Sequence, residues 1–358
     1  MVDWKKLGEI CELERGVRVI KKDLQQEGLI PVYQNSLTPL GYFDKSNYPE
    51  CTPFVICAGA AGEVGFCSKP FWAADDCTCI LCSSLANKKY IYYCLLVNQH
   101  TLKSQVRKAS VPRLSKDVIG KLVIPIPSLE EQARIVSILD TFTSSIDNLK
   151  QQIAQRRKQY EYYRDQLLDL EGKEGVEMKT LGNIGEICMC KRIMKEQTSD
   201  NDDIPFFKIG TFGGIADAFI SRELFEDYKS KYSYPKKGEI LISAAGTIGR
   251  SVVFDGKDAY FQDSNIVWLA NNEKVVTNRY LYYFYQIADW KTDGGTIKRL
   301  YNYNLKNTKI PIPSLSEQQR IVDILDKFEA SIQNLESQLS QREKQYEYYR
   351  NKLLTFED

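Results

Sequence analysis

Apolar residues recur at alternating steps of four and three in two stretches of the chain, one from Ile135 and one from Ile321. A 3.5-residue period kept over about five heptads is typical of a coiled coil. The sequence therefore predicts two long helices that pair with each other; the alternative is two separate amphipathic helices, each lying on its own domain. The residues predicted to make the pairing are Ile135, Leu139, Phe142, Ile146, Leu149, Ile153, Ile321, Leu325, Phe328, Ile332, Leu335 and Leu339.

Each predicted helix has a start signal and one arginine within its apolar series. Ser128 with Glu131, and Ser314 with Glu317, have the Ser-x-x-Glu spacing of a capping box. A pseudo-two-fold axis relates two such helices most simply when they are antiparallel, which would place their preceding regions at opposite ends of a rod roughly 60–65 Å long. In that register Arg156 lies opposite Phe328 and Arg342 opposite Phe142, so each guanidinium can stack on an aromatic ring.

The helices belong to an internal repeat that covers the chain. "IPIPSLEEQARIVSILD" at 124–140 returns as "IPIPSLSEQQRIVDILD" at 310–326, and "QYEYYRDQLL" at 159–168 returns as "QYEYYRNKLL" at 345–354. Between these near-identical segments the two regions keep only short echoes, such as "GEIC" at 8–11 and 185–188. The pattern predicts one scaffold that carries two different variable domains, with the segments 1–127, 128–172, 173–313 and 314–358.

The variable regions have the pattern of mixed α/β domains rich in short strands. "IPVYQNS", "PFVICAGA" and "CTCILCSS" in the first region, and "GEILISAAG", "SVVFDG" and "NIVWLA" in the second, are brief β-branched or aromatic runs. The fold class is therefore α+β. "AGAAGEVG" lacks the glycine spacing and Lys-Ser/Thr of a phosphate-binding loop, so Gly62 and Gly65, like Gly246 and Gly249, are predicted to make tight turns.

Composition indicates the location and the kind of partner of the protein rather than a reaction that it catalyses. No stretch approaches 18 apolar residues and the beginning of the chain lacks a signal-peptide core, so we expect no membrane span and a cytoplasmic location. Residues 1–127 carry 16 basic and 12 acidic groups, and residues 173–313 carry 20 and 18. The two helical segments are acidic instead, with 6 basic against 8 acidic groups at 128–172 and 6 against 9 at 314–358. Slightly basic domains on acidic helices fit nucleic acid at the domains and protein along the helices.

Candidate catalytic and metal-binding groups are few. His100 is the only histidine, and it has no evident partner in the sequence. Cys79 and Cys82 have the C-x₂-C spacing of a zinc site, but they lie in a predicted strand, where side chains at this spacing point apart. Buried free thiols are favoured over zinc, and no metal is expected.

The repeat resembles the specificity subunits (HsdS) of type I restriction-modification systems. In that family two target-recognition domains alternate with two helical regions that open with an "IPxP-x-x-EQ" phrase, which is "IPIPSLEEQ" at 124–132 and "IPIPSLSEQ" at 310–318 here. "IPVYQNSLTPLGYFD" at 30–44, "AGAAGEVGF" at 58–66 and "PFWAADD" at 70–76 also stand in the order found in a common type of first domain. The resemblance covers essentially the whole chain.

The resemblance implies a DNA-reading subunit without catalysis of its own. Its partners would be double-stranded DNA, two modification subunits that carry an S-adenosylmethionine-dependent adenine methyltransferase, and ATP-dependent restriction subunits. S-adenosylmethionine, ATP and Mg²⁺ are expected on those partners, and no cofactor is expected on this chain. In agreement, the sequence has no Asn/Asp-Pro-Pro-Tyr methyltransferase motif. The alternatives are a two-headed scaffold that binds proteins, a specificity subunit of a system whose methyltransferase and nuclease share one chain, and a metal-dependent enzyme.

Sequence-specific DNA contacts need Arg, Lys, Asn or Gln at base edges. Basic residues precede the two predicted helices at related places, and further polar residues lie in predicted loops of the variable domains. Solvated surface charge is the alternative for each of them. The predicted DNA-binding residues are Gln34, Asn35, Arg107, Lys108, Arg113, Lys208, Arg250, Lys298 and Arg299.

Overall fold

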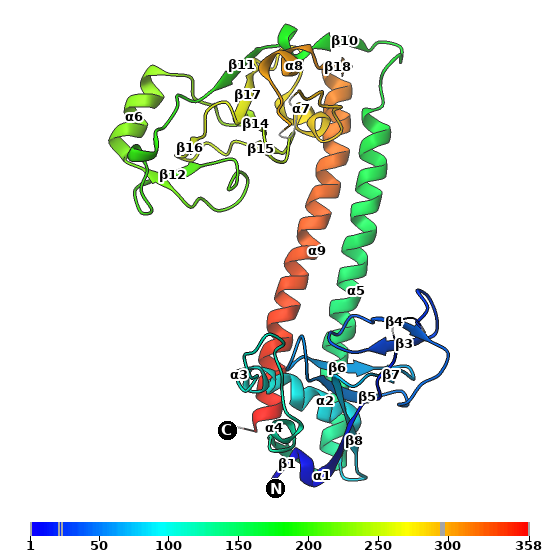
Figure 1. Cartoon of the computed structure of the whole chain (residues 1–358). Helices are drawn as coiled ribbons and strands as arrows, with labels where there is room; N and C mark the ends of the chain where they lie inside the picture. The colour runs from blue at the N-terminus through cyan, green and yellow to red at the C-terminus, as the bar shows by residue number, and fades with distance from the viewer. Residues whose placement is uncertain (1, 21, 23, 294–297, 357–358) are drawn as a thin grey trace. The chain divides into compact units, whose positions relative to one another are not determined.

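The computed structural model describes residues 2–20, 22, 24–293 and 298–356. The chain divides into two compact units, Met1–Gln151 with Glu336–Asp358, and Gln152–Leu335. The long helices α5 (Leu129–Leu168) and α9 (Leu315–Thr355) each contribute residues to both units (Figure 1). The predicted first and last residues of the chain's domains, Met1 and Asp358, lie outside the described residues.

In the first unit, the described residues form three small sheets. β1 (Asp3–Lys6) pairs with β9 (Val123–Ile126). The antiparallel sheet that follows has the order β2 (Cys11–Arg15), β8 (Cys77–Cys82), β5 (Thr52–Ile56) and β6 (Val64–Cys67). The last has the order β4 (Gly41–Phe43), β3 (Ile30–Tyr33) and β7 (Trp72–Ala73). The helices are α1 (Leu7–Ile10), α2 (Lys88–Val97), α3 (Gln99–Ser104) and α4 (Lys116–Gly120).

The described part of the second unit repeats this topology. β10 (Glu177–Thr180) pairs with β18 (Lys309–Ile312). The larger sheet has the order β11 (Glu186–Met189), β17 (Ile266–Ala270), β14 (Ile240–Ser243) and β15 (Ser251–Val253), and the smaller has the order β13 (Phe219–Ile220), β12 (Ile204–Phe207) and β16 (Tyr260–Phe261). The helices are η2 (Leu181–Asn183), η3 (Lys195–Gln197), α6 (Arg222–Lys231), α7 (Asn278–Tyr285) and α8 (Asn302–Asn307). The predicted α+β class and internal repeat are confirmed.

The larger sheet of each unit separates two hydrophobic cores, because successive strand residues face opposite sides. In β8, Ile80 faces the core that includes α2 and the start of α5, whereas Cys77 and Cys79 face the smaller sheet. In β17, Val267 and Trp268 divide in the same way. Each unit is therefore layered as long helix, short helix, larger sheet and smaller sheet, and the smaller sheet is the layer on the side away from the long helices.

A fully buried glutamine joins the start of each long helix to the loop that leads into the short helix. Gln132 accepts a hydrogen bond from the Asn87 N–H (2.8 Å) and donates to the carbonyls of Leu85 (3.1 Å) and Pro127 (2.9 Å). Gln318 repeats all three bonds, with the Thr277 N–H (2.9 Å) and with the Val275 (2.9 Å) and Pro313 (3.0 Å) carbonyls. Asn87 and Thr277 are the N-caps of α2 and α7, so one side chain sets the positions of two helix starts.

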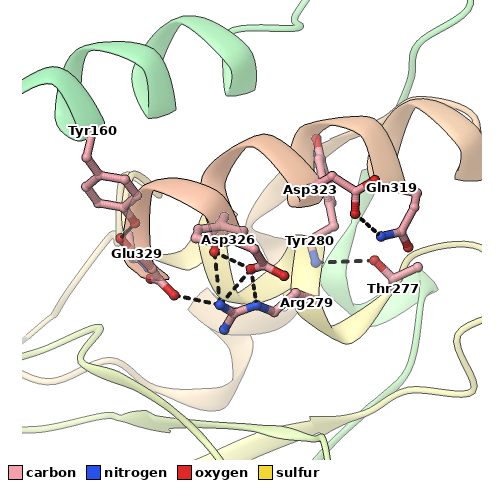
Figure 2. A network of polar contacts seen from close by, with 10 residues as sticks. Tyr160, Thr277, Arg279, Tyr280, Gln319, Asp323, Asp326 and Glu329 are labelled. Atoms are coloured by element: carbon pink, nitrogen blue, oxygen red, sulfur yellow. Dashed lines mark hydrogen bonds and ion pairs between the residues drawn. The ribbon is translucent and has the colours of Figure 1, made fainter. Parts of the chain in front are cut away.

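A second repeated contact lies two turns further along each long helix. Asp140 accepts hydrogen bonds from the Tyr93 hydroxyl (2.6 Å) and from Lys89 Nζ (2.9 Å). In the second unit Asp326 accepts from Tyr283 and from Arg279 Nε (2.7 Å), and Arg279 also donates to Glu329 (2.6 Å; Figure 2).

Burial raises the pKa of both tyrosines that donate to these aspartates, Tyr93 and Tyr283, and the bond to the carboxylate raises it further. Burial alone would lower the pKa of Arg279, but its bond to Asp326 and the nearby acidic groups outweigh this and raise it. The tyrosines therefore stay protonated donors and Arg279 stays charged, so the contacts persist across the neutral range.

The paired helices run antiparallel. Within the first unit, Phe142 stacks on Tyr349 and Lys150 pairs with Glu343 (3.3 Å). A later residue of α5 thus contacts an earlier residue of α9, as antiparallel helices require. The predicted stacking is confirmed in each unit. The Arg342 guanidinium lies 5.6 Å from the Phe142 ring centre and that of Arg156 5.8 Å from the Phe328 ring centre.

The residues predicted to pair the helices are buried or half-buried. Ile135, Leu139, Ile146, Leu149, Ile153, Ile321 and Leu325 are buried, and Phe142, Phe328, Ile332, Leu335 and Leu339 are half-buried. The seam residues nearest the start of each long helix also have a second role that the heptad pattern does not indicate. Ile135 and Leu139 share a core with α2 and with Leu354 from the end of α9, and Ile321 and Leu325 share one with α7 and Leu168.

Three details differ from the prediction. α5 ends at Leu168, short of residue 172, because the chain turns there through Gly172 at φ +75° and Leu170 enters the core of the second unit. Gly65 is not in a turn but in β6, where an added Cβ would meet the Phe54 ring at 2.3 Å. The serine half of each capping box forms, but the Glu131 and Glu317 carboxylates pair with Arg134 and Arg320.

Among the described residues, no helix combines the length and the apolar character needed to cross a bilayer.

We predict that Gln318→Ala destabilises the contact between α7 and α9. The change leaves the Thr277 N–H and two carbonyls without their partner, at a cost of roughly 2–3 kcal/mol. Hydrogen exchange of peptides that cover residues 270–290 should become faster in the variant. Gln319→Ala is the matched control, because Gln319 is exposed and bonds Asp323 on its own helix. Equal exchange in the two variants would contradict a structural role for the buried amide.

The arginine stacking generates a smaller prediction. Arg156→Ala removes a contact with the Phe328 ring that is worth about 0.5–1 kcal/mol at a partly exposed site. Hydrogen exchange of the segment 150–162 should accelerate several-fold, whereas Lys158→Ala, at an exposed position of the same helix, should leave it unchanged. Indistinguishable exchange in the two variants would show that Arg156 only fills space at the surface.

Candidate nucleic-acid interface

Polar residues from four segments meet at one edge of the first unit. Arg15 ends β2, Gln34 follows β3, Asp75 and Asp76 join β7 to β8, and Arg113 precedes α4. Arg15, Asp75, Asp76 and Arg113 line one open cavity of about 810 Å³, together with Arg107 and Lys116. Since these segments are strand ends and loops, their side chains can differ between proteins without changing the sheets.

A short hairpin presents the basic residues of this edge. The Arg107 N–H donates to the Arg113 carbonyl (2.8 Å) and the Arg113 N–H donates back (3.2 Å). The hairpin is attached to the turn after β5 through the Gly59 N–H, which donates to the Pro112 carbonyl (3.3 Å). Arg107, Lys108 and Arg113 are exposed, so the predicted DNA-binding residues of this segment lie together at the surface.

The predicted residues Gln34 and Asn35 lie beside the same turn. Gln34 Nε2 donates to Asp76 Oδ2 (3.3 Å), and the Asn35 carbonyl accepts from the Ala60 N–H (2.9 Å). The structure thus brings together all five residues predicted for the first domain around the turn at 57–62. The carboxylate of Asp76 adds a hydrogen-bond acceptor that the prediction did not include.

The second unit builds a corresponding edge with different side chains. Lys208 follows β12 and pairs with Asp217 (2.9 Å). Arg250 is exposed and donates to the Phe212 carbonyl (2.8 Å), so the loop between Lys208 and Asp217 is held from both sides. Arg299 donates to the carbonyl (3.0 Å) and hydroxyl (2.8 Å) of Ser264.

The hairpin is repeated as well. The Asp293 N–H donates to the Arg299 carbonyl (3.1 Å) and the Arg299 N–H donates back (3.0 Å), as Arg107 and Arg113 do in the first unit. Lys298 is exposed next to Arg299, and the hairpin tip at 294–297 lies outside the described residues.

Sequence reasoning missed one arginine at each edge. Arg15 donates to the Asp75 carbonyl (2.6 Å), and Arg192 pairs with Asp263 (2.9 Å). Both are exposed. Both follow a "GEIC" segment at the same spacing in the sequence, but the strand registers place Met189, not Arg192, at the position that corresponds to Arg15.

The cysteine cluster of the first unit packs the protein interior behind this edge. Cys77 donates to the Gln34 carbonyl (3.2 Å), and Cys57 contacts the Thr78 hydroxyl (3.1 Å). Burial raises the pKa of both thiols, which keeps them protonated and unsuited to nucleophilic chemistry. Cys79 and Cys82 face opposite sides of β8, as the strand pattern predicted.

Across the described ranges, no group of three or more His, Cys, Asp or Glu side chains is arranged to hold a metal ion. His100 is exposed at the surface. The chemistry that the edges offer is therefore hydrogen bonding and charge pairing. Guanidinium, ammonium, amide and carboxylate groups at loops are the groups with which proteins bind phosphates and read base edges.

Comparisons with known proteins agree with this assignment. The family model described as "Type I restriction modification DNA specificity domain" matches residues 1–156 and 173–342. A putative type I restriction enzyme specificity subunit of Haemophilus influenzae is 44% identical, with 99% of this chain and 96% of that protein covered. The EcoR124I/EcoR124II specificity subunit of Escherichia coli is 30% identical, with 99% and 94% covered. The solved S subunit from M. genitalium has a similar fold, with a TM-score of 0.67 at 18% identity over 99% of this chain and 96% of that one.

The two matches to one domain model, and relatives that are 44% and 30% identical over 99% of the chain, agree with the repeated architecture. The chain belongs to the family of type I restriction-modification specificity subunits, which recognise DNA and are not themselves enzymes.

Proposed function

We propose that this chain reads a split, asymmetric sequence of double-stranded DNA, with one half-site for each of the target-recognition domains 1–127 and 173–313. One observation carries the proposal. The two units build the same polar edge from the same strand ends, while side chains at that edge differ, as Gln34 and Lys208 do. Two readers of equal geometry but different chemistry suit a target whose halves differ in sequence.

The proposed partners are two modification subunits, which methylate adenine with S-adenosylmethionine, and restriction subunits, which use ATP and Mg²⁺. Exposed apolar side chains at matched positions support two copies of one docking partner. Leu129 and Leu315, in the first turn of each long helix, are 51% and 46% exposed, and Trp4 and Met178 are exposed on β1 and β10. Clustered exposed apolar residues mark protein-interaction sites, and each unit carries such a set once.

Exchange of the first recognition domain tests the proposed division of labour. Residue 127 lies between β9 and α5, so a cut there leaves both elements whole. We expect that replacing residues 1–127 with the corresponding segment of a relative alters one half of the methylated sequence and leaves the other half and the gap unchanged. The measurement is methylation-site mapping in cells that produce the chimaera with its modification subunit.

The reciprocal exchange of residues 173–313 is the control and should alter the other half. If either exchange changed both halves together, the two domains would not read independently. Duplex binding that did not weaken as salt rises would favour the alternative of a scaffold for proteins. Whether methylation and cleavage reside on one partner chain is decided by purification of the complex and identification of its subunits.

Partner docking generates a separate prediction. Leu129→Asp places a charge on the exposed apolar set of the first unit, while an acidic residue in the first helical turn is favourable for folding. Native mass spectrometry of the co-purified complex should then detect one modification subunit where the unaltered chain binds two. Ser316→Asp, at an exposed position of α9, is the control and should retain two. Two subunits bound to the Leu129 variant would show that docking lies elsewhere.

A further inference from the structure

The internal repeat offers a comparison within one chain, because the two edges present residues at matched positions. The hairpin holds Arg113 and Arg299, and the next residues, Leu114 and Leu300, donate to the equivalent carbonyls of Cys57 and Ala244. These positions are alike. The position directly after β3 and β12 differs, with Gln34 and Lys208, and so does the position before β8 and β17, with Asp76 and Asn265.

The positions that are alike suit the part of DNA that does not vary. Every half-site presents the same sugar-phosphate backbone, whatever its bases, and arginine is the side chain best suited to phosphate. Arg113 and Arg299 end the same backbone-bonded hairpin in the two units, so their side chains leave it at equivalent places. Arg113 is exposed, and Arg299 donates to Ser264 through one terminal nitrogen, Nη2.

Gln34 has the hydrogen-bond pattern that adenine requires. An amide NH₂ has two donors, and Asp76 Oδ2 accepts one of them at 3.3 Å, which fixes the orientation of the amide plane. The second N–H and Oε1 then form the donor and acceptor pair that matches N7 and the N6 amino group of adenine in the major groove.

Lys208 stands at the matched position of the second unit with a different pattern. Its ammonium group has three donors, and Asp217 accepts one of them at 2.9 Å. The others suit the two acceptors of guanine, O6 and N7, whereas adenine has an amino donor in place of O6. The companion position supports the contrast: Asn265 stands where the first edge has Asp76, so the second edge lacks at that position the carboxylate that orients the amide in the first.

We infer that the matched arginines Arg113 and Arg299 bind the DNA backbone at both half-sites, whereas Gln34 reads an adenine in one half-site and Lys208 reads a guanine in the other. This assignment rests on the proposed function, because it presupposes that both edges bind DNA.

The test uses the chain in complex with its modification subunit and a pool of duplexes in which each position of the wild-type target is varied in turn. Gln34→Lys should change the preferred base at one position of one half-site from adenine to guanine, and Lys208→Gln should make the opposite change at one position of the other. Gln34→Ala should abolish the preference at that first position only. It replaces Gln34→Lys as the test if the lysine variant folds poorly.

The arginine variants provide the contrasting result. Arg113→Ala and Arg299→Ala should weaken binding to every duplex by the same factor and reduce the slope of log affinity against log salt by about 1, with base preferences unchanged. A changed base preference in either arginine variant, or an unchanged preference in both Gln34 variants, would overturn this inference and leave the proposed function standing. A wild-type complex that prefers no split sequence would overturn the proposed function, and this assignment with it.

Discussion

The buried amides of Gln132 and Gln318 are the contacts on which the rest of the architecture depends. Each amide satisfies the backbone of a helix start and of a preceding loop at once, in a place that water does not reach. A buried polar group is tolerated only when its hydrogen bonds are made. These contacts therefore specify one position and orientation of each recognition domain on its long helix. The same three bonds occur in both units, although the surrounding domains have diverged.

That constraint explains why the chain repeats one segment so closely and lets the remainder drift. The long helices, the short helices and the inner faces of the larger sheets must fit one another, and a change in one requires changes in the others. The strand ends beyond the smaller sheets carry no such requirement. Residues there can change from Gln34 in one copy to Lys208 in the other while the layers remain the same. Stability and recognition therefore lie in different layers of the fold.

Much of this arrangement could be predicted from sequence, since periodicity and repetition report directly on helices, strands and duplication. The seam residues and the stacking of Arg156 on Phe328 follow from heptad spacing and an antiparallel register. The role of Gln132 could not be predicted from heptad spacing. Gln132 lies three residues before Ile135 and so continues the spacing of the seam, but a polar side chain at the end of a seam gives no hydrophobic signal. Arg15 was missed because the sequence does not distinguish it from other surface charges, and only the fold brings it beside Asp75 and Asp76.

The central claim is that one scaffold holds two different readers, and the sequence methylated in cells tests it most directly. Methylome sequencing of a strain that produces this chain with its modification subunit, compared with a strain that lacks the chain, would reveal the sequence read. The account predicts a target made of two unlike half-sequences separated by a gap of fixed length. A continuous target, a target with two identical halves, or methylation that does not depend on this chain would contradict it.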